Sequence, residues 1–181
     1  MLDVIHTGIN KSMEYDLSQP LNLYKKYRRK DVLRLLNMNF NQNEQSIGGY
    51  TNSNNHFAIF VTLDKGKDFK AARIAYEDEF IDERTFHWYT KAPRNLRSPE
   101  VQLLRNPGEY KFHLFVKRKY NQKENETDFY YLGEVVPLQE TIQQVEKQDK
   151  EGKKKSVVKL DFTLETPVEP NMYEFLTQNT N

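Results

Sequence analysis

The segment from residue 157 to residue 164 constrains the fold most, because apolar and polar residues alternate along it. Val158, Leu160, Phe162 and Leu164 are separated by single polar residues. In an extended strand this spacing puts all four side chains on one face. A strand with one apolar face needs neighbouring strands and a core to cover it. The segment therefore predicts a sheet rather than a helical bundle.

Four other segments are predicted to join this sheet. His56–Leu63 is a continuous apolar run typical of a buried strand, and Thr85–Tyr89 is rich in aromatic residues. In Tyr110–Lys117, Phe112, Leu114 and Val116 share one face, and Phe129–Val136 follows after a polar loop, so these two segments should form a hairpin. The chain has 11 Tyr, 11 Phe and one Trp, and aromatic residues favour strands. A further strand is predicted over Arg73–Phe80.

Two short helices are predicted. Within residues 30–37, Val32, Leu35 and Leu36 form a helical stripe. Ser98-Pro99-Glu100 is typical of a helix start, with a capping residue, a proline in the first turn and an acid near the positive end of the helix dipole. The sequence Asn106-Pro107-Gly108 should end that helix.

The remaining segments are predicted to lack regular structure. Residues 39–55 are rich in Asn and contain Gly48-Gly49, which is typical of a loop. Residues 139–155 are charged and contain few apolar residues, so we expect an exposed loop. Residues 1–14 should be a lead-in, and residues 171–176 a closing helical turn. The whole, residues 1–181, should form a single domain of the mostly-β (α+β) class, a bent sheet or β-pseudobarrel.

The composition excludes several kinds of site. There is no cysteine, so disulfides and thiolate metal sites are excluded. No apolar run approaches the roughly 20 residues that a membrane-spanning helix needs. The first residues lack the apolar stretch of a secretion signal. We expect a cytoplasmic protein with no membrane partner.

Charge is distributed unevenly along a nearly neutral chain. The net charge is +1, but residues 24–34 hold six Lys or Arg against one Asp, and residues 84–119 hold nine against two Glu. From residue 124 to the end, twelve acids face six lysines. Such segregation can give one side of a protein a positive field that attracts nucleic acid, or it can reflect solvated loops.

No sequence motif indicates a catalyst. The four histidines show no metal-ligand spacing along the chain, and there is no zinc signature, phosphate-binding glycine loop or nucleophile elbow. We therefore expect no catalytic residue, no metal and no cofactor. The alternative is a metal-dependent nuclease, because Glu109-Tyr110-Lys111 has the Glu-x-Lys form found in such enzymes, with Asp78, Asp82 or Glu83 upstream as a second carboxylate.

The richest stretch for nucleic-acid binding is Phe86–Ser98, which mixes aromatic and basic residues before a helix start. Arginine and helix N-termini suit phosphates, and aromatic rings stack on bases or enclose an extruded base. The basic-aromatic segment 24–34 has similar character, and Asn near a loop tip suits adenine. The candidate DNA-binding residues are Tyr50, Thr51, Asn52, Trp88, Tyr89, Thr90, Lys91, Arg94, Arg97, Ser98, Lys25 and Arg28.

Several blocks of the chain together resemble an uncharacterised bacterial domain. The blocks are Tyr27–Asn37, Ile59–Thr62, Tyr76–Phe80, Phe86–Trp88, Ser98–Gln102, His113–Lys117 and Phe129–Val135. The likeness spans roughly residues 15 to 176. The family often has Thr where this chain has Arg28, and Trp where it has Met38.

The resemblance implies a biological context. That domain typically ends large proteins that combine a phospholipase-D-like nuclease with a superfamily II helicase, which implies a role in restriction or defence. By analogy the terminal domain recognises the target and the helicase and nuclease carry out the chemistry. A β-barrel of this size also resembles the DNA-binding pseudobarrels of some restriction enzymes and plant transcription factors.

The sequence thus predicts a DNA-recognition module, specific for a sequence or for a modified nucleotide. Its partners would be double-stranded DNA and helicase and nuclease domains in the same polypeptide or complex. Two alternatives stay open: the nuclease above, and a protein-interaction domain that docks a helicase to its partner.

Overall fold

The computed structural model describes residues 19–39, 44–63, 77–118 and 127–178. The strands are β1 (Lys26–Tyr27), β2 (Tyr50–Ser53), β3 (His56–Leu63), β4 (Glu79–Phe80), β5 (Thr85–Tyr89), β6 (Lys111–Arg118), β7 (Phe129–Pro137), β8 (Gln143–Gln148) and β9 (Lys154–Leu164). The helices are α2 (Arg29–Leu35), α3 (Glu44–Ile47), α4 (Pro99–Arg105), the 3-10 turn η2 (Gln139–Thr141) and α5 (Pro170–Thr177).

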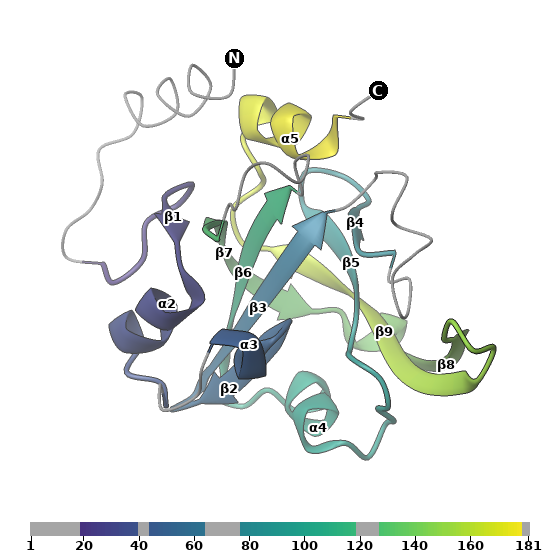
Figure 1. Ribbon diagram of the computed structural model, residues 1–181. Coiled ribbons are helices and arrows are strands. Elements are labelled where there is room, and N and C mark those ends of the chain that lie inside the picture. Colours follow the sequence, from purple (N-terminus) through teal and green to yellow (C-terminus); the bar gives the residue numbers. More distant parts are fainter. Residues whose placement is uncertain (1–18, 40–43, 64–76, 119–126, 179–181) are drawn as a thin grey trace.

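The strands form one nine-stranded mixed sheet in the order β2-β3-β6-β7-β9-β5-β4 (Figure 1). β1 pairs with β7 and β8 pairs with β9 outside this path. All pairings are antiparallel except that of β3 with β6, in which His56 lies opposite Lys111 and Leu63 opposite Arg118. The predicted mostly-β class and the β6–β7 hairpin are confirmed. The sheet is open, because the end strands β2 and β4 do not pair with each other in the described part of the chain.

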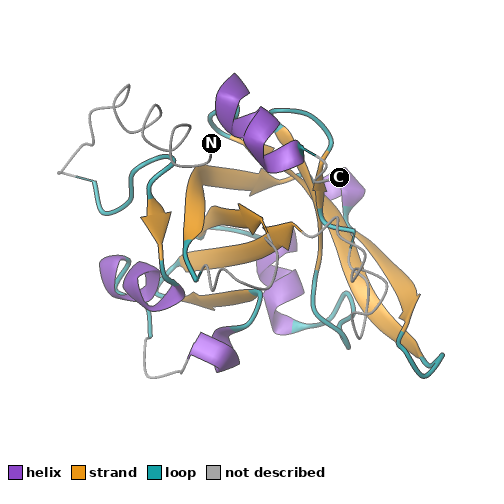
Figure 2. Cartoon of the chain, turned by 45° about the horizontal axis from the view of Figure 1, so that its top comes forward, coloured by secondary structure: helices purple, strands orange, loops and turns teal. Residues whose placement is uncertain are grey.

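The central strands β3 and β6 are buried on both faces, so the sheet separates two apolar clusters. One cluster takes Ile59 of β3 and the predicted face Phe112, Leu114 and Val116 of β6. The other takes Phe115 from the opposite face of β6. The sequence pattern predicted the first face correctly. It did not show that the second face is also covered, by α2 and the segment around β1 (Figure 2).

The two predicted helices are present, with corrections in detail. In α2 the buried side chains are Val32, Leu33 and Leu36, whereas Leu35 is 45% exposed. The predicted stripe was therefore correct for Val32 and Leu36 and wrong for Leu35, because Leu33 is buried instead. α4 begins at Pro99 as predicted, but the Ser98 side chain makes no cap hydrogen bond. Helical segments α3 and α5 also form.

Two segments predicted to be loops contain strands. Residues 39–55 include β2, which pairs antiparallel with β3, and residues 139–155 include β8 and the start of β9. β8 is mostly exposed, so its backbone pairing leaves no apolar pattern in the sequence. Of the strand predicted over 73–80, only β4 lies among the described residues, and positions 73–76 are outside them.

Within the described ranges, no helix has the length and apolar character needed to cross a membrane.

Candidate nucleic-acid interface

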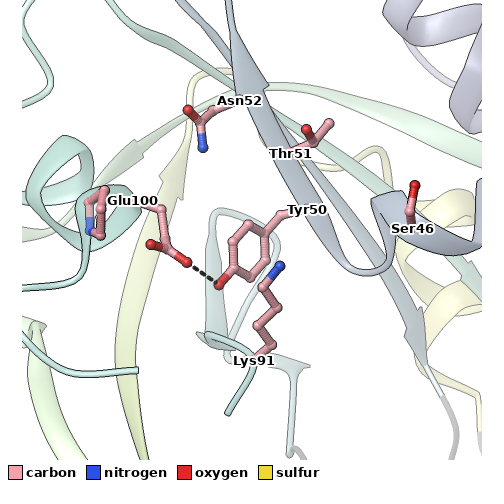
Figure 3. Close-up of a pocket in the computed structure, with 7 residues that line it drawn as sticks. Ser46, Tyr50, Thr51, Asn52, Lys91 and Glu100 are labelled. Atoms are coloured by element: carbon pink, nitrogen blue, oxygen red, sulfur yellow. Dashed lines mark hydrogen bonds between the residues drawn. The ribbon is translucent and has the colours of Figure 1, made fainter. Parts of the chain in front are cut away.

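A hollow of about 500 Å³ lies where β2 meets the segment that joins β5 to α4 (Figure 3). It brings together residues that are some forty positions apart in the sequence. Its lining comes from α3, β2, the loop after β5 and the first turn of α4: Ser46, Tyr50, Thr51, Asn52, Lys91, Pro99 and Glu100. Four of the predicted DNA-binding residues, from two separate segments, therefore share one site.

Tyr50 forms the wall of this hollow and is fixed on several sides. The antiparallel pairing of β2 with β3 places Tyr50 opposite Ile59. Its ring stacks on Phe57 with centroids 5.6 Å apart, and meets Trp88 edge-on at 5.3 Å. The Lys91 ammonium lies 4.9 Å from the ring centroid. The tyrosine thus joins the core to a cation at the opening of the hollow.

A charged hydrogen-bond network extends from the Tyr50 hydroxyl. The hydroxyl donates to Glu100 Oε1 at 3.0 Å, and Arg94 Nε bonds the same oxygen. Burial, together with the Glu100 charge, raises the pKa of Tyr50. Burial alone would raise the pKa of Glu100, but the hydrogen bonds from Arg94, from its own backbone amide and from Tyr50, together with the Arg94 charge, outweigh burial and lower the pKa. Glu100 is therefore an anion at the wall of the hollow.

The basic loop divides into bound and exposed cations. The Arg94 side chain is held by Glu100 and by the Pro93 carbonyl, so Arg94 is an internal counter-ion rather than an exposed contact. Arg97 and Lys91 are exposed. The Ser98 hydroxyl accepts a bond from the Asn95 amide at 3.0 Å and shapes the loop.

The strand half of the predicted stretch packs inward. Trp88 is 2% exposed and Thr90 is fully buried, and the Thr90 hydroxyl accepts a bond from the Val158 amide at 3.0 Å. Neither residue has a surface for DNA contact, so both predicted contacts are corrected to structural roles. Alternation along the extended strand explains why Tyr89, unlike Trp88, is only half-buried.

Tyr89 lies in a second polar environment beside the sheet. Its backbone amide donates to Asp78 Oδ1 at 2.9 Å, and the Lys147 ammonium lies 4.5 Å from its ring centroid. Burial raises the pKa of Asp78 to about 7 despite that hydrogen bond. Tyr89 is thus partly covered and does not line the hollow over Tyr50.

Lys25 and Arg28 lie with β1 and α2, and they do not line the hollow. The Lys25 ammonium is 5.7 Å from the Tyr27 ring centroid, and Arg28 Nε is 3.4 Å from Asp128 Oδ1. Arg28 occupies the cap position of α2 without a side-chain cap bond. These two cations therefore belong to a separate surface.

The structure also assembles a polar chain that the sequence did not reveal. His56 Nδ1 is 2.9 Å from His113 Nε2, and His113 Nδ1 is 3.0 Å from the Tyr131 hydroxyl. Burial lowers the pKa of His113 to about 3 and, together with the charge of Lys111, lowers that of His56. The two histidines meet because β3 and β6 are parallel neighbours, and only knowledge of that pairing could have linked them.

A second hollow, of about 450 Å³, contains a histidine paired with a carboxylate. His87 Nδ1 lies 2.5 Å from Asp161 Oδ1, as the β5–β9 register requires, and Lys159, Thr141 and Glu140 are among the other lining residues. No nucleophilic side chain is held against His87 by any hydrogen bond in the described ranges.

The residues named for the nuclease alternative make hydrogen bonds and ion pairs with different partners rather than with one another. Asp82 Oδ1 accepts bonds from the amides of Arg84 and Thr85, which closes a turn. Lys111 Nζ lies 3.6 Å from Glu134 Oε1, and Asp78 bonds the Tyr89 amide. Among residues 19–39, 44–63, 77–118 and 127–178, no three His, Asp or Glu side chains gather as metal ligands.

Comparisons with known proteins give one assignment. A comparison with curated proteins found no match. Residues 21–176 match the family described as a domain of unknown function (DUF3427). That range covers every described strand and nearly all of the last helix, and so the chain belongs to this family.

Proposed function

We propose that this chain is a DNA-recognition module, and that the hollow over Tyr50 reads one nucleotide of the target. The observation that carries the proposal is the meeting of Tyr50, Asn52, Lys91 and Glu100 in one hollow (Figure 3). An amide, a cation and an anionic acceptor are groups that recognise a base edge and its phosphate. The Tyr50 ring is only 5% exposed and stacks on Phe57, so it supports these groups rather than stacking on a base.

Each group has a distinct role in this proposal. The Asn52 amide can both donate to and accept from a base edge, and the fixed Glu100 carboxylate accepts from an exocyclic amine. Lys91 neutralises a phosphate at the opening. The volume of about 500 Å³ lies within the range of small-molecule sites, so a base drawn out of the duplex is the fitting occupant. Modified bases are natural targets of such a site, because a base drawn into the hollow is read on its edges.

The placement in a bacterial restriction or defence system rests on the resemblance to domains fused to helicases and nucleases. In that setting the helicase and nuclease partners would act on the DNA that this module selects. The module would itself cleave nothing, which fits the internal hydrogen bonds of Asp82 and the pairing of Lys111 with Glu134.

The test is a binding screen by fluorescence anisotropy with plain, methylated, hydroxymethylated and phosphorothioated duplexes. We expect one class to bind best, and Asn52→Ala to reduce that preference more than it reduces binding to plain duplex. Lys91→Gln should weaken binding to all duplexes and reduce the slope of log K against log salt by about 0.9. Lys111→Gln, at the ion pair with Glu134, is the matched control and should bind as the parent does.

Three outcomes separate this proposal from its alternatives. Cleavage of plasmid in magnesium or manganese that disappears in Glu109→Ala would favour the nuclease. Binding to a helicase fragment without binding to any duplex would favour the docking domain. A salt-independent interaction with DNA would exclude phosphate contacts by Lys91.

A further inference from the structure

The hairpin of β8 and β9 extends away from the rest of the sheet (Figures 1 and 2). The two strands pair from Gln143 opposite Lys159 to Gln148 opposite Lys154. β5 pairs with β9 only from Lys159 onward, so the outer part of the hairpin is a two-stranded ribbon. We name residues 143–156 the arm.

The outer half of the arm contributes no apolar side chains to the core of the protein. Between Val145 and Val157 there is no apolar side chain. A two-stranded ribbon without an apolar face is marginally stable by itself. The outer half therefore adds no buried core, and its exposed side chains are available to a partner.

The turn at the end of the arm is nevertheless well defined. Asp149 Oδ1 accepts bonds from the amides of Glu151 at 3.0 Å and Lys153 at 2.9 Å. Gly152 has φ of +77°, a conformation that suits glycine, and its amide bonds the Asp149 carbonyl. Asp149 therefore fixes the turn through its carboxylate, which still counts as a negative charge of the arm.

The arm is rich in lysine. It carries Lys147, Lys150, Lys153, Lys154 and Lys155 against Glu146, Asp149 and Glu151, a balance of five to three. Lys154 pairs with Glu146 at 3.3 Å and Lys153 with Glu151 at 3.1 Å, with all four side chains about two-thirds exposed or more. Such exposed pairs are weak, so phosphates can replace the acids.

Hydrogen bonds connect the arm to the loop beside the candidate site. The Arg94 amide donates to the Ser156 carbonyl at 2.8 Å, and the Ser156 hydroxyl donates to the Arg94 carbonyl at 2.6 Å. The Leu96 amide bonds the Gln144 side chain at 3.2 Å. The loop that carries Lys91 and Arg97 therefore runs along the base of the arm, and the two hold a fixed position relative to each other.

We propose that the arm lies in a groove of duplex DNA beside the hollow over Tyr50, with its lysines on the flanking phosphates. A two-stranded β-ribbon fits the width of the major groove of B-DNA. This inference rests on the proposed function. It adds a second DNA-binding surface, which sets affinity, beside the hollow, which sets specificity.

The test changes Lys150, Lys153, Lys154 and Lys155 to Gln in the full chain. Binding to plain and modified duplexes should weaken by the same factor. The slope of log K against log salt should fall by about 0.9 for each lysine that no longer neutralises a phosphate, roughly 2 to 4 in total. The thermal melting midpoint should stay unchanged, since no apolar side chain is altered. A double control, Arg84→Gln with Lys111→Gln, removes charge from the turn before β5 and from β6, and should leave most of the slope intact.

A second variant gives an effect of opposite sign. Glu146→Gln with Glu151→Gln frees Lys154 and Lys153 from their acid partners, so duplex affinity should rise. The slope could stay unchanged in the four-lysine variant while Lys91→Gln and Asn52→Ala still weaken binding. That result would reject the placement of the arm in a DNA groove and would leave the proposed function intact. If the parent binds no duplex, both fail. If the arm lysines affect binding to anionic vesicles but not to DNA, the groove assignment is wrong.

Discussion

Two polar networks lie on opposite faces of the sheet, and they differ in charge. On one face, Tyr50, Glu100 and Arg94 form an ionised network at the edge of an open hollow. On the other, His56, His113 and Tyr131 form a network that stays neutral, because burial lowers the pKa of His113 to about 3. The comparison shows that one sheet can stabilise an ionised network beside solvent on one face and a neutral network in a buried site on the other.

The depth of each network explains the difference. Glu100 keeps its charge because Arg94 compensates it beside solvent, whereas the hydrogen-bond partners of the buried His113 ring are His56 and the Tyr131 hydroxyl, neither of which is a carboxylate. A buried neutral imidazole can serve as one donor and one acceptor, which is what a chain between His56 and Tyr131 needs. The first network is thus suited to recognition and the second to stability.

The largest expected effect concerns the core beneath the charged network. Trp88→Ala should lower the free energy of unfolding by about 3–5 kcal/mol, because truncating a buried aromatic side chain leaves a cavity. Tyr89→Ala, its half-buried neighbour, should cost less. Urea unfolding followed by circular dichroism measures both. A stable Trp88→Ala protein that no longer binds DNA would show that Trp88 contacts DNA after all.

The pH dependence of stability should separate the two networks. The pKa of His113 is lowered on folding, so the contribution of His113 to stability falls as pH drops from about 6.5 towards 3. The raised pKa of Asp78, about 7, contributes in the opposite direction between about pH 7 and 3.8. The pKa of Glu100 is also lowered, so its stabilisation is complete above about 4.5 and disappears only below that value.

The measurement is urea unfolding at a series of pH values, with His113→Asn as the comparison. The Asp78 contribution is common to both proteins, so the stability of the parent relative to the variant should fall as pH drops from about 6.5 to 4.5. Both proteins should keep the acid destabilisation below about 4.5. Equal slopes in parent and variant across the upper window would mean that His113 titrates normally.

A smaller effect is expected from removing the charge of the first network. Glu100→Gln keeps the shape of the side chain but leaves Arg94 without its anion, and should cost about 1.5–3 kcal/mol, the range of hydrogen bonds to charged groups. Arg94→Gln is the reciprocal variant. If the double variant is as unstable as the sum of the two single variants, the pair does not interact energetically, and the network is a geometric coincidence.

The smallest expected effects come from the two hydroxyl groups. Tyr131→Phe leaves the Nδ1 of buried His113 without its partner and should cost about 1–3 kcal/mol. Tyr50→Phe should cost about 0.5–1.5 kcal/mol, because Arg94 still bonds Glu100. Thermal melting midpoints of the two variants measure this difference, and Tyr131→Phe should have the lower midpoint. A lower midpoint for Tyr50→Phe would contradict the role of the neutral network in stability.

Strands with an apolar face were predictable, because burial leaves a local pattern. The alternation at residues 158–164 and the run at residues 56–63 are β9 and β3 as predicted. β8 was missed because both of its faces are largely polar, and side-chain contacts with β9 such as the exposed pair of Glu146 and Lys154 leave no apolar pattern. A pattern of side chains carries no information about such pairing.

The candidate site was predictable in its residue types but not in its assembly. The sequence pointed to Tyr50–Asn52 and to Lys91 separately, and only the β2–β3 pairing and the position of α4 place them in one hollow. Alternation required that one of Trp88 and Tyr89 face the core, but could not say which one. The ion pair of Arg94 with Glu100 was not predicted, because Glu100 comes from the next helix and the sequence does not show that the two side chains meet.

The parallel pairing of β3 with β6 also has a consequence for how the chain folds. Residue 56 lies opposite residue 111, and residue 87 opposite residue 161, so the middle of the sheet joins segments that are remote along the chain. Loops of that length must close before those strands can pair, and chains dominated by such remote pairings fold on the scale of milliseconds to seconds rather than microseconds. During that interval the apolar strand β3 is exposed, and a neighbouring domain or chaperone that covers it would favour folding over aggregation.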